Sequence, residues 1–405
     1  MTVMATTTIL FVMATTLMMV VAFQMQATEV RVGRVRAMHV ADAGINAYLY
    51  QLRGDATYYV SHPDTGWTIV SGQEKYRVKA VPPTVGHPLT LYSMGVAGDG
   101  TQTIAATVRL RTFADYMFLS GSDLSLAGDA DVTGQIRANG NIDNQGKIHG
   151  QAIASGTFSG KAPDQGSLVN QPPASFEAVS DWMRDKMRPA AIAGGSYFPP
   201  SAASGYRVVV NGNTIVVDKI TGGIDTGDFV TVPVTSIAIP ASGVVYFEDT
   251  VWIQGSFSSS VTFAVKKSDS VGDIYLIGDY APASVDSTAT SGLIAEGNII
   301  VPGWFGKQDL NVNAAMMART GHIYADIKQG FTSNRISIKG SLAYGLSGGD
   351  FGTVDKFTGQ PVSGFRQKYY TYDQRLALYP PPLYPQIADE SLKVDTWVEE
   401  RNIDW

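Results

Sequence analysis

Cysteine is absent from this chain of 405 residues. Without thiols the protein forms no disulfide bond, no thiolate metal site and no cysteine nucleophile. Charge is scarce as well, because charged residues make up 16% of the chain and the formal net charge is -6. A chain with this balance carries no large basic patch of the kind that binds nucleic acid. We therefore expect no nucleic acid among its partners.

Charged side chains are also missing from residues 1–28, and Glu29 is the first one. As a helix, about 20 apolar residues cross the hydrocarbon core of a membrane, so this segment is long enough. A cleaved secretory signal needs basic residues before its apolar stretch. Nothing basic precedes this run, and no break follows it. We therefore expect a membrane-inserted helix.

The helix is predicted to continue through residues 29–53, which contain no proline. Small or apolar residues recur there in steps of three and four, which places them on one stripe of a helix. They are Val30, Gly33, Ala37, Val40, Ala41, Gly44, Tyr48 and Leu52. Gly54 and Asp55 then supply a stop signal. The pattern predicts a single helix over residues 1–53.

Several positions of this stripe are small. Gly33, Ala37 and Ala41 lie four residues apart, and Gly44 lies four residues after Val40. Small residues at this spacing allow two helix backbones to approach closely. We interpret Gly33, Ala37, Ala41 and Gly44 as a surface on which the helix packs against copies of itself. The plainer interpretation is a single-span membrane anchor followed by a stalk.

A chain that begins with methionine, enters an apolar segment at once and continues as one long helix resembles type IV pilins and pilin-like proteins. The resemblance implies that a prepilin peptidase removes a basic leader, that the new N-terminus at Met1 is methylated, and that many helices bundle into a filament core. The family usually has glutamate at the fifth mature position, where it pairs with a neighbour's terminal amine. Here that position is Ala5.

The orientation of the chain also points to a removed leader. Arg31, Arg34 and Arg36 follow the uncharged segment. Under the positive-inside rule, these arginines alone would hold the large remaining domain on the cytoplasmic side. We therefore expect that a more basic leader preceded Met1, and that the sequence is the processed form.

Residues 54–113 are predicted to form a small antiparallel sheet that covers the upper helix. Strand-like runs occupy residues 67–70, 74–81, 89–97 and 102–112. Gly98-Asp99-Gly100 forms a hairpin turn between the last two. A helix followed by such a sheet is similar to the longer minor pilins.

From residue 114 the pattern changes to very short strands separated by glycine. Apolar residues recur there every four to six positions, at Val132, Ile136, Ile142, Ile148, Ile153 and Phe158. This recurrence favours a β-helix or another solenoid. We place a β-helix-like domain at residues 114–350, with a helical insertion near 161–206. The predicted fold class is α+β and mainly β: a long helix, a small antiparallel sheet and a solenoid.

The C-terminal residues 351–405 are rich in tyrosine and proline. Tyr369, Tyr370, Tyr372, Tyr379 and Tyr384 surround the run from Pro380 to Pro382. These aromatic side chains suggest either a binding platform or a clamp over an open end of the solenoid. We favour the clamp.

Residues able to support catalysis are sparse. No HExxH, GxSxG or phosphate-loop pattern occurs. Asp273 and Asp279 form the nearest carboxylate pair, and they flank one strand as turn residues would. Asp123, Asp129 and Asp131 could bind calcium, but aspartates more often cap turns. We expect no enzyme activity, no cofactor and no bound metal.

These observations predict a structural subunit of an extracellular, type IV pilus-like filament. Helix 1–53 would form the core and the β domain would be exposed. Its partners would be copies of itself or other pilins, and the membrane before assembly. The alternative is a membrane-anchored β-solenoid surface protein that binds cell-wall or extracellular polysaccharide.

Overall fold

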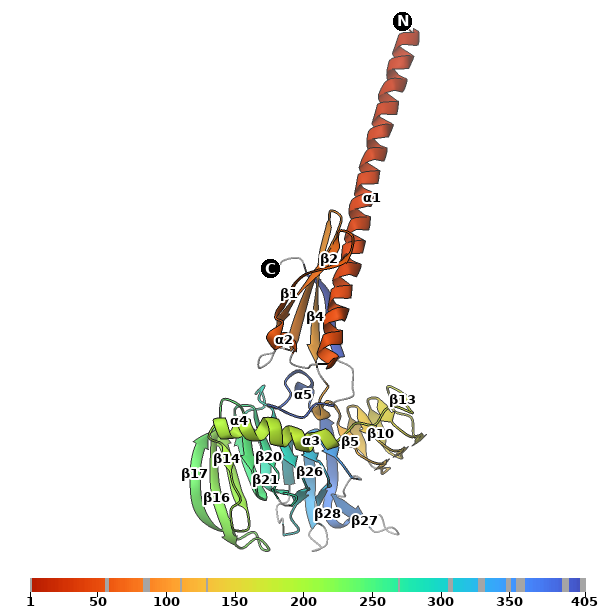
Figure 1. The fold of residues 1–405 in the computed structure, drawn as a ribbon. Coiled ribbons are helices and arrows are strands. Elements are labelled where there is room, and N and C mark those ends of the chain that lie inside the picture. The colour runs from red at the N-terminus through yellow and green to blue at the C-terminus, as the bar shows by residue number, and fades with distance from the viewer. Residues whose placement is uncertain are drawn as a thin grey trace. The chain divides into compact units, whose positions relative to one another are not determined.

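The chain folds into two compact units in a computed structural model. The structure describes residues 2–54, 58–82, 88–109, 111–128, 130–268, 270–304, 309–326, 332–346, 351–354, 361–387 and 393–400. The helix–sheet unit comprises Met1–Leu110 and Ser391–Trp405, and the solenoid unit comprises Arg111–Glu390. A long helix, a small antiparallel sheet and a large β-rich domain are present (Figure 1). The predicted fold class is therefore confirmed.

The helix–sheet unit consists of helix α1 (Thr2–Gly54) and one antiparallel sheet. In spatial order the strands are β1 (Asp64–Ser71), β2 (Glu74–Val81), β3 (Leu89–Ala97), β4 (Gly100–Arg109) and β29 (Lys393–Glu400). Strand β3 alternates strictly between buried and half-buried residues, as a strand with one covered face should. The unit has its own apolar core, which Ile45, Tyr48 and Leu52 of α1 share with Val78, Leu91 and Val108 of the sheet.

Strand β29 comes from the predicted clamp region, residues 351–405, but it completes the small sheet. It pairs antiparallel with β4, and Arg109 lies opposite Lys393. The chain therefore leaves the sheet at β4 and returns to it at the neighbouring strand. In topological terms, the solenoid unit is an insertion between two adjacent strands.

The solenoid unit is built from parallel strands that stack in successive coils. In spatial order one face contains β14 (Tyr197–Phe198), β18 (Val244–Phe247), β20 (Val261–Val265), β22 (Ser291–Ala295), β24 (Asp309–Ala318), β26 (Thr332–Tyr344), β5 (Phe118–Ser120), β8 (Ile136–Ala138), β11 (Ala152–Ala154) and β13 (Ser167–Leu168). A second face contains β15 (Tyr206–Gly212), β19 (Val251–Phe257), β21 (Ile274–Pro282), β24, β26, β28 (Pro361–Tyr372), β7 (Asp131–Thr133) and β10 (Lys147–His149).

Shorter strands complete the coils. Strand β23 (Ile299–Val301) lies beside β21, and β25 (Ile323–Ala325) lies beside β23. A third face contains β6 (Leu124–Leu126), β9 (Ile142–Asn144) and β12 (Phe158–Gly160). At the other end of the stack, β16 (Thr214–Gly222) and β17 (Val230–Ala238) extend the sheet from β15 in antiparallel fashion. The side chains that point inward form one continuous apolar core.

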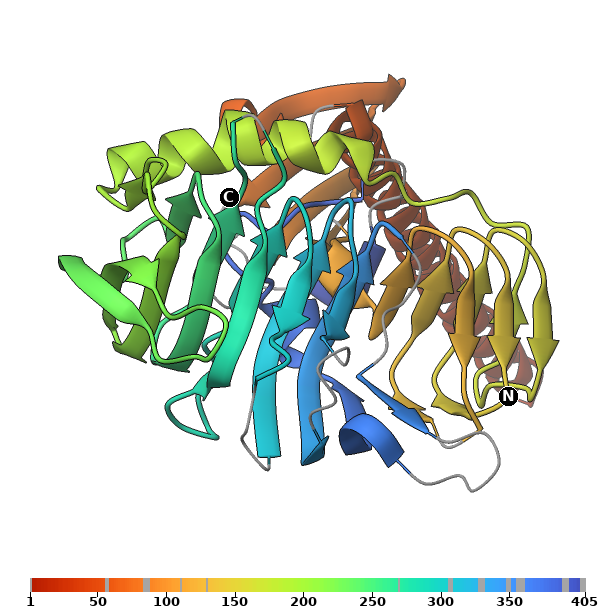
Figure 2. The same ribbon diagram turned by 90° about the horizontal axis from the view of Figure 1, so that it is seen from below.

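The chain enters this stack in its middle. It first forms β5, next to β26, and coils outward to β13. A helical crossover, made of α3 (Glu177–Trp182), a π-helical turn (Met183–Met187) and α4 (Arg188–Ala193), then leads to β14 at the opposite end. From there the coils run back to β26. Figure 2 shows the helical crossover in yellow-green along one side of the stack, with the yellow strands beside the blue ones.

Glycine permits the close contact where the two runs of coils meet. A Cβ atom on Gly121 would lie 2.2 Å from the backbone oxygen of Gly345, in the neighbouring coil. The sequence predicted that residues 161–206 interrupt the solenoid. The structure shows instead that they connect its two ends, because strands distant in sequence, β26 and β5, stack directly on each other.

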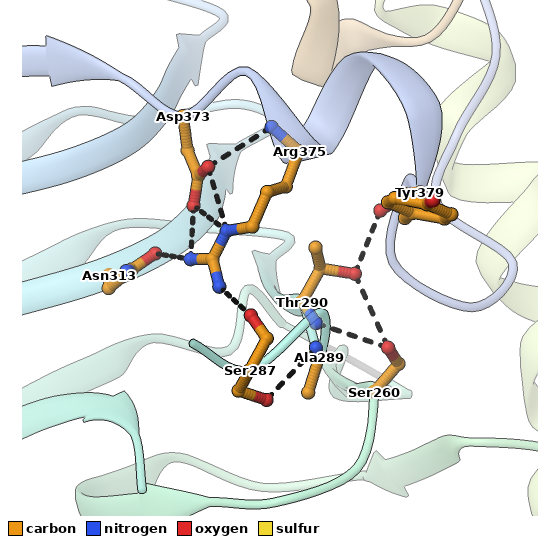
Figure 3. Close-up of polar contacts among 8 residues, drawn as sticks. All are labelled: Ser260, Ser287, Ala289, Thr290, Asn313, Asp373, Arg375 and Tyr379. Carbon is orange, nitrogen blue, oxygen red and sulfur yellow. Dashed lines mark hydrogen bonds and ion pairs between the residues drawn. The ribbon is translucent and has the colours of Figure 1, made fainter. Parts of the chain in front are cut away.

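Residues 373–387, which we call the strap, cross several coils on the flank of the solenoid (Figure 3). The Arg375 guanidinium donates hydrogen bonds to the Ser287 carbonyl (2.5 Å) and to Asn313 Oδ1 (3.3 Å). Thr290 donates to the Tyr379 carbonyl (2.9 Å). The sequence suggested a cover over an end of the solenoid, whereas these contacts lie along its side.

A second apolar cluster lies beneath the strap and the helical crossover. Met183 and Met187 of the crossover and Leu376 and Tyr384 of the strap pack with outward-pointing residues of the coils, such as Ile294. Burial raises the pKa of Tyr384 above its usual range. Tyr384 thus acts within the core, while Tyr369 is half exposed on β28.

Candidate assembly surface on the N-terminal helix

The small residues of α1 meet a matching row of small residues on the sheet of the same chain. Ala37 and Ala41 are fully buried. A Cβ atom on Gly95 of β3 would lie 2.1 Å from the Ala37 carbonyl oxygen and 2.4 Å from the Ala41 nitrogen. A Cβ atom on Gly44 would lie 2.4 Å from Ser93 Oγ. Helix and strand backbones therefore touch, and this contact occupies Ala37, Ala41 and Gly44.

Gly33 lies at the N-terminal boundary of this contact. It is half-buried, and a Cβ atom there would meet Gly100 N at an ordinary distance of 3.5 Å. Alternating small residues on β3, such as Ser93 and Gly95, are the sequence signal for the contact with the sheet. Packing of the four predicted residues against another copy stays a prediction.

The N-terminal part of α1 is not covered by the sheet, and we call residues 11–36 the bare helix segment. Its large apolar side chains are exposed: Phe11, Met13, Leu17, Met18, Met19, Val20, Val21, Phe23, Met25, Val30, Val32 and Val35. Met18, for example, is 76% exposed. The five consecutive residues from Leu17 to Val21 point to every side of the helix, so no single face is polar.

Two threonines of the bare helix segment donate their hydroxyl hydrogens to carbonyl groups of the same helix. Thr15 donates its hydroxyl hydrogen to the Phe11 carbonyl (2.9 Å), and Thr28 donates to the Gln24 carbonyl (2.7 Å). Threonine bonded in this way presents mainly its methyl group to the surroundings. Over the part of the chain that the structure describes, no helix has the length and hydropathy of a membrane span.

The charged residues of the bare helix segment lie at its C-terminal end. Glu29, Arg31, Arg34 and Arg36 are all exposed. No ion pair joins any of them to another residue that the structure describes. The predicted processed terminus, Met1, lies outside the described residues.

The aspartates considered as calcium ligands do not converge. Asp123 Oδ1 accepts a hydrogen bond from the Asn141 backbone nitrogen (2.6 Å), as a turn cap does. Asp131 lies 3.2 Å from Nε2 of His149, while Asp164 lies 2.8 Å from Nδ1. The hydrogen bond that Asp164 accepts, together with the charges of Asp164 and Asp131, raises the pKa of His149. Asp129 lies outside the described residues, and within them no group of three or more potential ligands could hold a metal ion.

Asp273 and Asp279 bind to neighbouring coils rather than to each other. Asp273 Oδ1 accepts hydrogen bonds from Asn298 N (2.6 Å) and Nδ2 (3.1 Å). Asp279 Oδ1 accepts one from Asn311 N (2.9 Å). Both carboxylates serve the stacking of coils. The absence of enzyme activity stays a prediction.

The sequence patterns did not predict one cluster of buried charges in the solenoid unit. Glu296 is 5% exposed, and its carboxylate lies 2.6 Å from the Arg319 guanidinium and 3.4 Å from the Lys266 ammonium. Ser180 of the helical crossover bonds to both Glu296 (3.3 Å) and Lys266 (2.8 Å). These charges follow strands of adjacent coils, so only the stacking register reveals that they meet.

Comparisons with known proteins give little to set beside this geometry. No family model and no curated protein sequence matches the chain. Among solved structures, the chain is similar to the competence-associated pilin ComZ from Thermus thermophilus. The identity is 11%, the TM-score is 0.31, and the match covers 91% of this chain and 97% of that one. A likeness at this level carries no argument about fold or function.

Proposed function

We propose that the protein is a structural subunit of an extracellular, type IV pilus-like filament. In this proposal α1 forms the filament core, and the sheet and the solenoid unit face outward. The bare helix segment is the observation that carries the proposal. Its exposed apolar side chains need a covering partner, because large contiguous apolar patches on a folded protein mark sites of interaction.

The distribution of these side chains favours a bundle over a simple pair. A helix that packs on one partner has one apolar stripe, whereas a helix that is apolar all round is surrounded. The bare helix segment is of the second kind. Covering each large side chain contributes roughly 1.5 to 3 kcal/mol. Contact with several copies, or with other pilins, would satisfy all sides at once.

The same helix needs cover before assembly as well. We propose that it resides in the membrane at that stage, that a prepilin peptidase produces Met1 as the terminus, and that this terminus is methylated. The sheet covers only the C-terminal part of α1, so lipid would surround the N-terminal part. The role is structural rather than catalytic.

The proposal is tested by electron microscopy of material sheared from cells that express the chain. We expect filaments that bind antibodies against the solenoid unit, and an N-terminal peptide that begins at Met1 in mass spectrometry. Met18→Glu should abolish the filaments, because it places a charge inside the bundle. The matched control is Tyr50→Glu, at an exposed position of the sheet-covered helix. Chains that remain single in the membrane would overturn the proposal in favour of the anchored surface protein.

A further inference from the structure

The charged residues at the C-terminal end of the bare helix segment lack partners within their own helix. Glu29 would pair with cations three or four residues away, but those positions are Val32 and Gly33. Arg31 and Arg34 are two and five residues away, where side chains do not face each other. All these charges are exposed.

The helix places the anion and two of the cations on different sides. Successive residues turn by about 100° around the axis, so Arg31 lies about 200° and Arg34 about 140° from Glu29. Arg36 falls within about 20° of the Glu29 side, two turns further along. One side of the helix therefore presents a carboxylate, and the far side presents two guanidinium groups almost one turn apart along the axis.

We propose that, in the filament, Glu29 of one copy pairs with Arg31 or Arg34 of the next copy. The inference rests on the proposed function and specifies the contact between subunits. A carboxylate that enters a contact between apolar helices loses its hydration and needs a cation. Arg31 and Arg34 are the first cations after Glu29 in the sequence, and both are exposed.

The two sides make this contact heterologous, since the surface that supplies Glu29 differs from the surface that supplies the arginines. A heterologous contact repeats from copy to copy, and it produces an open filament when the rotation between copies does not close into a ring. A single polar pair between apolar helices also fixes their register along the axis. The pair therefore accounts for both growth and alignment of the copies.

A first test changes the charges in the full chain. Glu29→Gln should raise the concentration needed for assembly by about tenfold or more, because one partner of a desolvated pair is lost. Arg36→Gln, on the Glu29 side, is the control and should assemble like the wild type. The combined reversal Glu29→Arg, Arg31→Glu and Arg34→Glu should restore assembly relative to Glu29→Arg alone.

A second test uses the absence of cysteine, which makes any introduced thiol unique. Copies carrying Glu29→Cys are assembled with copies carrying Arg34→Cys and treated with a bis-maleimide as long as a glutamate–arginine pair. We expect cross-linked dimers from this mixture, and few from Glu29→Cys mixed with Arg36→Cys. If wild-type filaments form without this difference, the pairing is wrong and the proposed function stands. If the wild type forms no filaments, the proposed function itself is wrong.

Discussion

Gly95 and Gly33 lie on either side of the same helix–sheet contact, and they tolerate a side chain differently. Gly95→Ala would press a methyl group against backbone atoms of Ala37 and Ala41, which cannot rotate away. Overpacking of this kind costs about 1 to 3 kcal/mol or more. Gly33→Ala has room, and it should stabilise the helix by about 0.5 to 1 kcal/mol.

Hydrogen exchange of the full chain measures both changes in the helix–sheet unit. We expect amides of β3 and of helix residues 37–52 to exchange faster in Gly95→Ala and slightly more slowly in Gly33→Ala. Equal exchange in Gly95→Ala and the wild type would show that helix and strand do not touch as described.

These two glycines also show what single residues predict. The spacing of Gly33, Ala37, Ala41 and Gly44 indicated a close backbone approach, and each of the four lies against the small sheet, Gly33 against the backbone of Gly100. The spacing did not identify which element packs against these residues, because a neighbouring helix and a strand pose the same steric requirement. The glycine of the partner strand, Gly95, distinguishes the two only once β3 is placed on the helix.

At the scale of elements, an ion pair within the strap orients Arg375, whose guanidinium bonds to Ser287 and Asn313 of the coils. Asp373 is 2% exposed, and its carboxylate bonds to the Arg375 guanidinium at 2.5 Å. Arg375→Met would leave this carboxylate buried without its cation, which costs about 3 to 5 kcal/mol. Adding Asp373→Asn should recover part of that loss, because the uncompensated charge disappears.

Hydrogen exchange of residues 373–387 in the full chain provides the measurement. We expect Arg375→Met to lose protection in the strap and the double variant Asp373→Asn, Arg375→Met to regain some of it. The control is Arg184→Met, whose partners Asp181 and Asp185 lie on an exposed helical surface. A double variant less protected than Arg375→Met would contradict the assignment of the pair.

Element types were predicted more reliably than their connections. The amphipathic pattern within residues 161–206 predicts a helix, and the glycine spacing predicts coils. Neither predicts that the helical crossover joins opposite ends of the stack. That outcome depends on β26 pairing with β5, and pairing between strands so distant in sequence leaves no local periodicity.

At the scale of the whole molecule, the insertion of the solenoid unit could not be predicted either. Strand β29 has the sequence KVDTWVEE, which does not alternate regularly between apolar and polar residues, and its Val394, Trp397 and Val398 are exposed. Its partner β4 lies on the far side of the entire solenoid unit in sequence. The helix, the small sheet and the coils follow from local patterns, whereas the closing strand follows from a long-range pairing.

The insertion predicts that the helix–sheet unit folds without the solenoid unit. Arg109 and Lys393 lie opposite each other, so an Asn-Gly turn between them should connect β4 to β29 as a hairpin. Among the residues that the structure describes, the apolar core of this unit comes from α1, the sheet and the short helix Tyr58–Ser61, all of which the deletion retains. In detergent, which covers the bare helix segment, we expect slow hydrogen exchange in β2, β3 and β4.

The control ends at Arg109 and lacks β29, which leaves the edge of β4 unpaired. It should exchange faster in β4, because that strand loses its ladder of hydrogen bonds on one side. If the hairpin variant exchanges as fast as this control, the sheet depends on the solenoid unit, and the prediction that the helix–sheet unit folds without it is wrong.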